Sequence, residues 1–433
     1  MDYNRQVEEI SKYFKNSEKS IEDFKVGIEF EHFVIDRDTF RTVSYYGDGG
    51  VEETLRELES NGWIGDYEGE YLLGLTNENK VITLEPGSQL EFSTKPQMSI
   101  MDIEKEYLQF LREIVAILER KNQALIAVGY HPKTRIEEIK LLPKKRYDYM
   151  FEYFKDKGSH AHNMMKGTAS IQVAFDFSSE EDYIKKFKIG NALAPVMYAI
   201  FDNAFYFEGG TWDRHNLRSY IWENCDRNRS GIVEGTFDKD FGYGKYAEYI
   251  LNRPPIFMDD GNRLYFTGEK PFKEIFDPES YTVHELEHGL TMFFPDVRTK
   301  QYVEIRMMDA VPYPLNFACI ALWKGILYDE NNLERVYKCI KDMDMGDIDL
   351  AKASILEGGL DGKLRGESII EIANWLIGLA KVGLVQEEAE YIRPLEEMLN
   401  DGNNPYELVR KKDHLGREKA LEWCILNDLQ EVR

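Results

Sequence analysis

Residues 25–35 have the sequence Lys25-Val26-Gly27-Ile28-Glu29-Phe30-Glu31-His32-Phe33-Val34-Ile35, and this stretch decides the fold. It alternates as a β-strand does, because successive side chains of a strand point to opposite faces of the sheet. One face is apolar and carries Val26, Ile28, Phe30 and Val34. The other face carries Glu29 and Glu31, and two carboxylates about 4 Å apart near a protein surface repel each other by roughly 4 kcal/mol. We therefore expect a cation or a shared proton between them.

Three later stretches repeat this arrangement, at residues 89–93, 168–177 and 301–307. The first puts Glu91 on a polar face with Gln89 and Ser93, and the second puts Gln172 on a polar face. In the third, Glu304 and Arg306 share a face. An ordinary half-exposed sheet explains any one of these strands. Four of them with acidic or amide residues on the same kind of face favour a functional acidic surface.

Charge and composition limit the classes of function. The chain has 433 residues, of which 43% are hydrophobic, so it can bury a sizeable core. Its 78 acidic residues against 54 basic ones give a net charge of -24. Such a charge argues against nonspecific nucleic-acid binding and against docking on an anionic membrane. We expect small-molecule substrates, while the oligomeric state is left open.

The cysteines and the N-terminal sequence bear on the cell compartment. Cys225, Cys319, Cys339 and Cys424 have neither metal-ligand nor C-x-x-C spacing. The first residues lack the apolar core of a signal peptide, and no apolar run approaches the ~18 residues of a membrane span. These features predict a protein of the reducing cytoplasm.

The remaining pattern predicts an α+β fold with an antiparallel sheet, because strands concentrate before residue 310 and helices follow it without β-α alternation. Helices are expected at residues 2–16, 50–61, 99–121, 179–201 with a break near Pro195, 315–328, 368–381 and 417–430. A hairpin is expected from runs 71–75 and 81–84, and a further strand at 124–129. We predict one catalytic domain over residues 1–433, with a sheet-rich core at about 20–310 and a helical region at about 312–433.

Residues 218–231 mix aromatic side chains with three arginines, and their pattern fits neither a clean helix nor a clean strand. Loops of this composition often hold anionic ligands. The alternative is a solvated surface loop with scattered charges.

Residues 284–288 read His-Glu-Leu-Glu-His and match the H-E-x-x-H zinc motif. A zinc metallopeptidase through His284, Glu285 and His288 needs a third ligand from a later helix, whereas the next candidate, Glu304, lies in a predicted strand. The zinc interpretation also leaves the other acidic strands unexplained. The glycines near Gly47 have neither Walker nor Rossmann spacing, so a nucleotide would bind without a P-loop.

Taken in order, five motifs resemble glutamate-cysteine ligase, in its plant-type and related bacterial branch. They are residues 27–31 (Gly-Ile-Glu-Phe-Glu), 82–93 (Ile-Thr-Leu-Glu-Pro-Gly-Ser-Gln-Leu-Glu-Phe-Ser), 218–222 (Arg-Ser-Tyr-Ile-Trp), 294–298 (Phe-Pro-Asp-Val-Arg) and 302–306 (Tyr-Val-Glu-Ile-Arg). The resemblance covers roughly residues 20–330. It implies an antiparallel sheet curved into a funnel with helices on its outer face, as in glutamine synthetase-like folds, whose inner wall holds ATP, glutamate and Mg²⁺, or Mn²⁺ in its place.

The resemblance also implies roles for single residues. Metal ligands would be Glu29, Glu31, Glu85, Glu91 and Glu304. Arg306 would contact phosphate during transfer, with Glu304 beside it as a second catalytic residue. Substrate-binding residues would be Arg218 for a substrate carboxylate, Gln172 near the metals, and Trp222.

The implied reaction joins the γ-carboxylate of glutamate to the amine of cysteine through a γ-glutamyl phosphate, the first step of glutathione biosynthesis. The family usually has Val-Gln-Val-Asn where this chain has Ile171-Gln172-Val173-Ala174. This departure leaves the amine acceptor open, since a small apolar pocket discriminates weakly between similar side chains. The alternatives are a ligase using a different amine, a noncatalytic nucleotide-binding relative and the zinc metallopeptidase.

Overall fold

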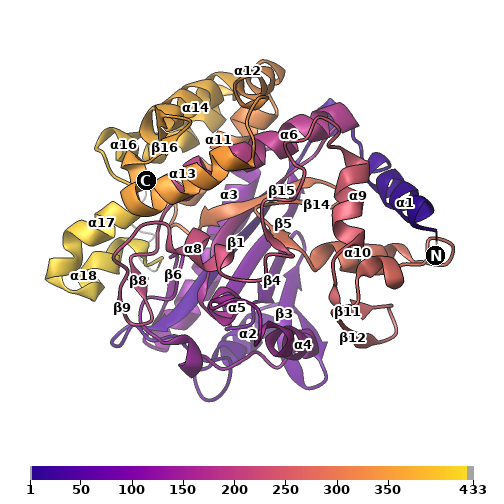
Figure 1. Ribbon diagram of the computed structural model, residues 1–433. Coiled ribbons are helices and arrows are strands. Elements are labelled where there is room, and N and C mark those ends of the chain that lie inside the picture. The colour runs from indigo at the N-terminus through magenta and orange to yellow at the C-terminus, as the bar shows by residue number, and fades with distance from the viewer. Residues whose placement is uncertain (1, 427–433) are drawn as a thin grey trace.

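The computed structural model describes residues 2–426, and a nine-stranded sheet lies at its centre (Figure 1). The strand order is β14-β15-β7-β1-β5-β4-β3-β2, with β6 paired to the second half of β1, and all pairings in this sheet are antiparallel. The strands are β1 (Val26–Asp36), β2 (Ile64–Glu68), β3 (Tyr71–Asn77), β4 (Lys80–Leu84), β5 (Leu90–Gln97), β6 (Gln123–Ile126), β7 (Ser170–Phe175), β14 (Val297–Thr299) and β15 (Val303–Asp309). The predicted α+β class with an antiparallel sheet is confirmed.

One face of the sheet is apolar, and helices cover it. Phe30 of β1 meets Tyr107 of α3 (Ile100–Arg120) and Phe317 of α11 (Leu315–Leu327), with ring centroids 4.9 and 5.6 Å apart. The apolar row of β7 is likewise buried, as its alternation predicts. This packing turns the acidic row of β1 to the opposite face.

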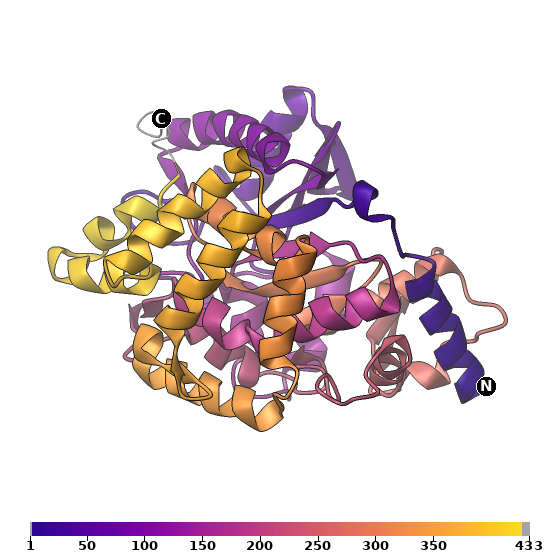
Figure 2. The same cartoon turned by 90° about the horizontal axis from the view of Figure 1, so that it is seen from above.

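The remaining helices surround the sheet. The C-terminal ones lie together on one side of the molecule, away from α1, and Figure 2 shows them from above. They are α12 (Glu330–Ile340), α13 (Met345–Gly358), α14 (Ile369–Gly383), α15 (Gln386–Ala389), α16 (Arg393–Asn400), α17 (Pro405–Lys412) and α18 (Arg417–Leu421). The earlier helices are α1 (Tyr3–Lys15), α2 (Val51–Ser60), α4 (Lys145–Phe154), α5 (Ala161–Gly167), α6 (Glu180–Ala192), α7 (Ala194–Ile200), α8 (Leu217–Glu223), α9 (Tyr243–Leu251) and α10 (Val283–Thr291).

Short strand pairs lie outside the main sheet. They are β8 (Tyr206–Phe207) with β9 (Gly210–Thr211), β10 (Ser230–Gly231) with β13 (Phe294–Pro295), β11 (Ile256–Asp259) with β12 (Leu264–Gly268), and β16 (Lys363–Leu364) with β17 (Glu367–Ser368). Within residues 2–426, every helix falls short of the length and apolarity that crossing a bilayer requires.

Most predicted elements are confirmed with small shifts of their ends. Ser99 caps α3 by accepting a hydrogen bond from the backbone N–H of Met101, and the helix 179–201 is broken into α6 and α7 next to Pro195. β6 ends earlier than expected because the N–H of Ala127 donates to the carbonyl of Cys424. The helix expected at 417–430 is shorter than predicted, because α18 ends at Leu421 and only one 3-10 turn, Glu422–Cys424, follows it. Residues 427–430 of this prediction lie outside the described residues.

One prediction is wrong. The stretch 218–231 is not irregular throughout, because residues 217–223 form helix α8. The N-cap residue of this helix, Asn216, has a left-handed backbone with φ 54°, and its side chain forms no capping hydrogen bond but donates to the carbonyl of Ile355.

Candidate active site

Four central strands bring the predicted acidic residues onto one face of the sheet. Across β1 and β5, Glu31 lies opposite Glu91, and across β1 and β7, Glu29 lies opposite Gln172. Glu304 of β15 follows on the next strand, opposite Ala174. Residues up to 275 positions apart in the sequence thus form one row, because the strand order places β15, β7, β1 and β5 side by side.

This row lines two adjoining cavities. A cavity of about 270 Å³ contains Glu29, Glu31, Glu85, Glu91 and Gln172 on the sheet side. Side chains of α4, α5 and α8 close it from the other side, including Tyr147, Met150, Met164, Met165, Arg218 and Trp222. The second cavity, of about 310 Å³, also contains Glu29 and Gln172 and extends to Glu304, Tyr302 and Lys25. Every site residue predicted from the sequence lines at least one of these two cavities.

Glu31 is fixed by hydrogen bonds to both of its oxygens. Ser170 donates from its backbone N–H at 2.8 Å and from Oγ at 3.1 Å, and Gln172 donates from Nε2 at 2.8 Å. Burial, together with the nearby carboxylate of Glu85, raises the pKa of Glu31 to about 7. The carboxylate is thus held in place but poorly compensated by positive charge.

The carboxylates of Glu29 and Glu91 are also poorly compensated by positive charge. Burial and the charge of Glu304 raise the pKa of Glu29, and burial and the charge of Glu29 raise the pKa of Glu91 well above its usual range. Glu91 accepts one hydrogen bond, from Oγ1 of Thr83 at 2.6 Å. Half-buried carboxylates in this state attract a hard divalent cation, for which oxygen is the preferred ligand. The donor set therefore fits Mg²⁺, although within residues 2–426 no three such side chains are already gathered around one point.

Glu304 is in a different state, because three cations surround it. Arg298 donates from Nε at 2.6 Å, Arg306 donates from Nη1 at 2.8 Å, and Nζ of Lys300 lies 3.4 Å away. Burial alone would raise the pKa of Glu304, but the three cations lower it well below its usual range. Glu304 is thus a counter-ion in this structure, and a metal ligand at this position stays a prediction.

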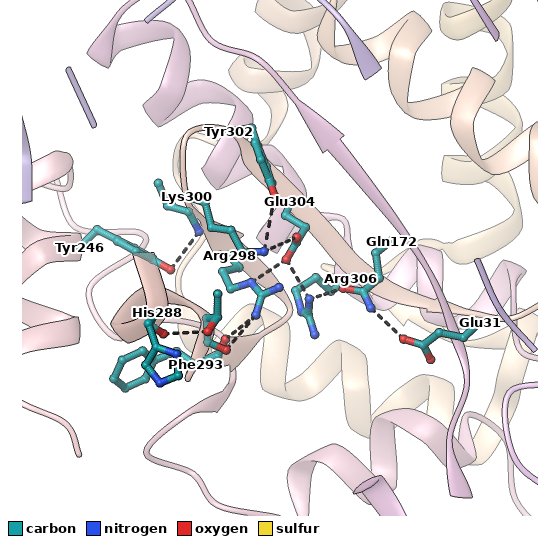
Figure 3. Close-up of polar contacts among 12 residues, drawn as sticks. Glu31, Gln172, Tyr246, His288, Phe293, Arg298, Lys300, Tyr302, Glu304 and Arg306 are labelled. Atoms are coloured by element: carbon teal, nitrogen blue, oxygen red, sulfur yellow. Dashed lines mark hydrogen bonds and ion pairs between the residues drawn. The ribbon is translucent and has the colours of Figure 1, made fainter. Parts of the chain in front are cut away.

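A chain of polar contacts connects Glu304 to Glu31 (Figure 3). Arg306 donates from Nη1 to Oε1 of Gln172 as well as to Glu304, and Gln172 in turn donates to Glu31. The predicted common face of Glu304 and Arg306 is therefore confirmed. Beyond Arg306 the alternation ends, since β15 has an irregularity in its pairing with β7 between Ile305 and Met308.

Arg218 lies on α8 and lines the first cavity, with only 3% of its surface exposed. Its Nη1 donates to the carbonyl of Met307 at 3.0 Å, and its guanidinium lies 5.7 Å from the ring of Trp222. In residues 2–426, no carboxylate comes within 4.0 Å of this guanidinium, and its Nε has no hydrogen-bond partner. A buried arginine in this state is suited to an anionic ligand.

Sequence reasoning assigned no role to several cavity residues, although one of them, Arg298, ends the quoted motif 294–298. Arg298 and Lys300 precede Glu304 on a short hairpin, and their basic side chains at i, i+2 were a usable signal. Lys144 and Arg146 line the first cavity from the start of α4, where the basic run 144–146 leads into an aromatic helix. Met164 and Met165 carried no such signal, because methionines on a short helix look like ordinary core residues.

The H-E-x-x-H residues have local partners. His284 lies 3.4 Å from Oδ2 of Asp259, and Nε2 of His288 lies 3.3 Å from the carbonyl of Phe257. Glu285 forms a capping box with Thr282 at the start of α10. The glutamate thus caps its own helix, which is not the task of a catalytic base. That no zinc binds here stays a prediction.

An antiparallel sheet with acidic side chains on one face and arginines beside them suits an enzyme that transfers phosphate by positioning and charge neutralisation. The comparisons make this specific. The chain belongs to the glutamate-cysteine ligase family 2 (GCS2), whose profile matches residues 25–422. The predicted resemblance is confirmed.

Relatives cover most of the chain. It is 31% identical to glutamate-cysteine ligase B of Oryza sativa subsp. japonica over 92% of this chain and 82% of that protein. With the enzyme of Nicotiana tabacum the identity is 31%, over 94% and 80%, and with that of Arabidopsis thaliana it is 30%, over 92% and 78%. All three are named as chloroplastic proteins, and this contradicts the expected cytoplasmic location.

A solved structure shares the fold. The glutamate-cysteine ligase of Francisella tularensis, crystallised in complex with AMP, aligns with a TM-score of 0.54 over 93% of this chain and 87% of that one. The sequence identity is 13%, so this likeness concerns the fold alone.

Proposed function

We propose that this chain is an ATP- and Mg²⁺-dependent ligase that joins the γ-carboxylate of L-glutamate to the amine of L-cysteine, the first step of glutathione biosynthesis. Membership of the glutamate-cysteine ligase family and the names of the relatives support the activity, and the AMP complex of the Francisella tularensis structure supports its dependence on ATP. The observation that carries the proposal is the first cavity, where undercompensated carboxylates line the same space as a buried arginine whose Nε has no hydrogen-bond partner.

Arg218 binds a carboxylate of glutamate in this proposal. Its guanidinium presents two parallel N–H donors, and a bidentate carboxylate pair fixes both distance and orientation. Trp222 lies beside Arg218 and limits the space around the bound substrate. The γ-carboxylate then faces the acidic row of the sheet, on the same side as Arg306.

Phosphoryl transfer follows at the acidic row. An oxygen of the γ-carboxylate attacks the terminal phosphorus of ATP, and the bond from that phosphorus to ADP breaks. Glu29, Glu31 and Glu91 would hold Mg²⁺, with Glu85 beside them, and the ion neutralises phosphate charge when bound. Arg306 supplies positive charge at the transferring group, and Gln172 and Glu304 hold its guanidinium in place.

Ligation completes the cycle. The amine of the acceptor attacks the carbonyl carbon of γ-glutamyl phosphate, the bond from carbon to the phosphate oxygen breaks, and the nitrogen loses a proton. The apolar side of the cavity, with Met150, Met164 and Met165, is suited to a small uncharged side chain such as that of cysteine.

The acceptor assay tests this function. Phosphate release is measured with ATP, Mg²⁺ and glutamate, and each of the twenty amino acids is added in turn as acceptor. We expect the largest rate with cysteine and a product with the mass of γ-glutamylcysteine. A larger rate with another amine would show that this amine, and not cysteine, is the acceptor. ATP binding without glutamate-dependent phosphate release would identify a noncatalytic relative.

A further inference from the structure

A helix of the C-terminal region, α13, contacts both ends of α8, the helix that carries Arg218. At the N-terminal end of α8, Asn216 donates from Nδ2 to the carbonyl of Ile355 at 2.9 Å, and the N–H of His215 donates to the carbonyl of Leu356 at 3.0 Å. Both acceptors belong to α13, which lies far from α8 in the sequence but next to it in space.

The same helix reaches the other end of α8 through a lysine. Nζ of Lys352 lies 3.6 Å from Oε1 of Glu223, the last residue of α8, and 3.0 Å from Oδ2 of Asp296. Lys352 is only 8% exposed. Burial disfavours its charged form, but the two carboxylates outweigh this effect and raise the pKa of Lys352. The ammonium group therefore stays charged.

Asp296 connects this lysine to the catalytic strand. Its second oxygen accepts a hydrogen bond from the hydroxyl of Tyr198 at 2.9 Å, and its carbonyl accepts one from the backbone N–H of Arg306 at 3.0 Å. Asp296, Arg218 and Arg306 also line one small cavity of about 10 Å³, next to the main one. Lys352 thus joins the helix of Arg218 to the strand of Arg306 at the point where the two meet.

We propose that Lys352 is a positioning residue of the active site, which ties α8 to the β14–β15 hairpin and so sets the place of Arg218 relative to Arg306. This inference rests on the proposed function, in which Arg218 binds glutamate. Without Lys352, Glu223 and Asp296 lose their shared cation, and the end of α8 moves away from the hairpin. Displacements of about 1 Å at a positioning group cost up to about a hundredfold in activity.

The test compares three variants in steady-state kinetics and glutamate binding. Lys352→Met removes the charge but keeps much of the side-chain volume, and we expect its KM for glutamate to rise about tenfold while the KM for ATP changes less than about twofold. Lys352→Arg should restore most of the glutamate affinity. The matched control is Lys324→Met, because Lys324 of α11 is another little-exposed lysine of the helical region and pairs with Glu388 at 2.6 Å. In this control, the KM for glutamate and the KM for ATP should change by the same factor.

Three outcomes would overturn the proposal. They are an unchanged KM for glutamate in Lys352→Met, equal rises of the KM for glutamate and the KM for ATP in that variant, or a selective rise of the KM for glutamate in Lys324→Met. If Lys352→Met does not fold, Glu223→Gln decides, since it removes only the contact at the end of α8 and should raise the KM for glutamate about threefold. Wild-type protein without glutamate-dependent phosphate release would instead contradict the proposed function, so the two failures are distinguishable.

Discussion

The acidic row contains carboxylates in two opposite electrostatic states. Glu304 is overcompensated by Arg298, Lys300 and Arg306, whereas Glu29 is undercompensated. Sequence alternation predicted the common face of Glu304 and Arg306 but not this difference, because Arg298 and Lys300 come from the neighbouring strand β14 and the turn after it, whose register no local pattern specifies.

A matched pair of isosteric substitutions tests these two states. In metal-free protein, Glu29→Gln removes a repelling buried charge, so the free energy of unfolding should stay equal or rise. Glu304→Gln leaves three cations without their counter-ion and should lower the free energy of unfolding by about 3 kcal/mol. Urea unfolding measures both. Phosphoryl transfer should fall by about a hundredfold or more in each variant, and near-normal turnover at ordinary Mg²⁺ would remove that residue from the site.

Arg218→Lys tests the bidentate grip on glutamate. A lysine keeps the charge but lacks the planar fork, so the KM for glutamate should rise at least about tenfold while the KM for ATP changes little. Steady-state kinetics with each substrate varied in turn measures the two KM values. Equal losses for both substrates would indicate that Arg218 orders α8 and does not bind glutamate.

At the level of elements, the sequence predicted seven of the nine strands of the main sheet and most of the long helices, but not β2, β14 or α13. Period-2 alternation located the four acidic strands, and apolar stripes located helices such as α3. It failed at α8, because a seven-residue helix with arginine and aromatic side chains has no clear apolar stripe. Such a helix forms through its contacts with α13 and β15, which lie far away in the sequence.

The zinc-like motif gives a prediction at this scale. Since Glu285 caps α10 and both histidines have local partners, purified protein should contain no stoichiometric zinc. His284→Ala should therefore keep its ligase activity. Elemental analysis checks the metal content. One zinc per chain, lost together with activity in His284→Ala, would contradict the ligase account.

At the level of the whole molecule, the buried end of β15 makes stability depend on pH. Burial raises the pKa of Asp309 to about 7, above its ordinary value of 3.8. The folded state thus binds this proton more tightly than the unfolded state, so the contribution to stability is complete below about pH 4 and is lost as the pH rises through about 7.

Asp309→Asn removes this titration. Relative to wild type, its free energy of unfolding should increase by about 2 kcal/mol between about pH 5 and about pH 7. Urea unfolding at several pH values, with metal absent, measures the difference. Parallel pH profiles of the two proteins would show that Asp309 does not titrate in this range.

The organisation of the chain as one catalytic domain stays a prediction. The contacts of α13 with α8 support it, since they connect the helical region to the site. Sequence alone could not place this region, because its helices carry apolar stripes that say nothing about which surface they cover.

The central claim is that this site makes γ-glutamyl phosphate, and oxygen transfer tests it most directly. Glutamate labelled with ¹⁸O in its γ-carboxylate is turned over with ATP, Mg²⁺ and cysteine, and the released phosphate is analysed by mass spectrometry. Because attack by the γ-carboxylate leaves one of its oxygens on phosphorus, we predict one ¹⁸O atom in each phosphate formed. Unlabelled phosphate would mean that water attacks ATP and would contradict the ligase mechanism.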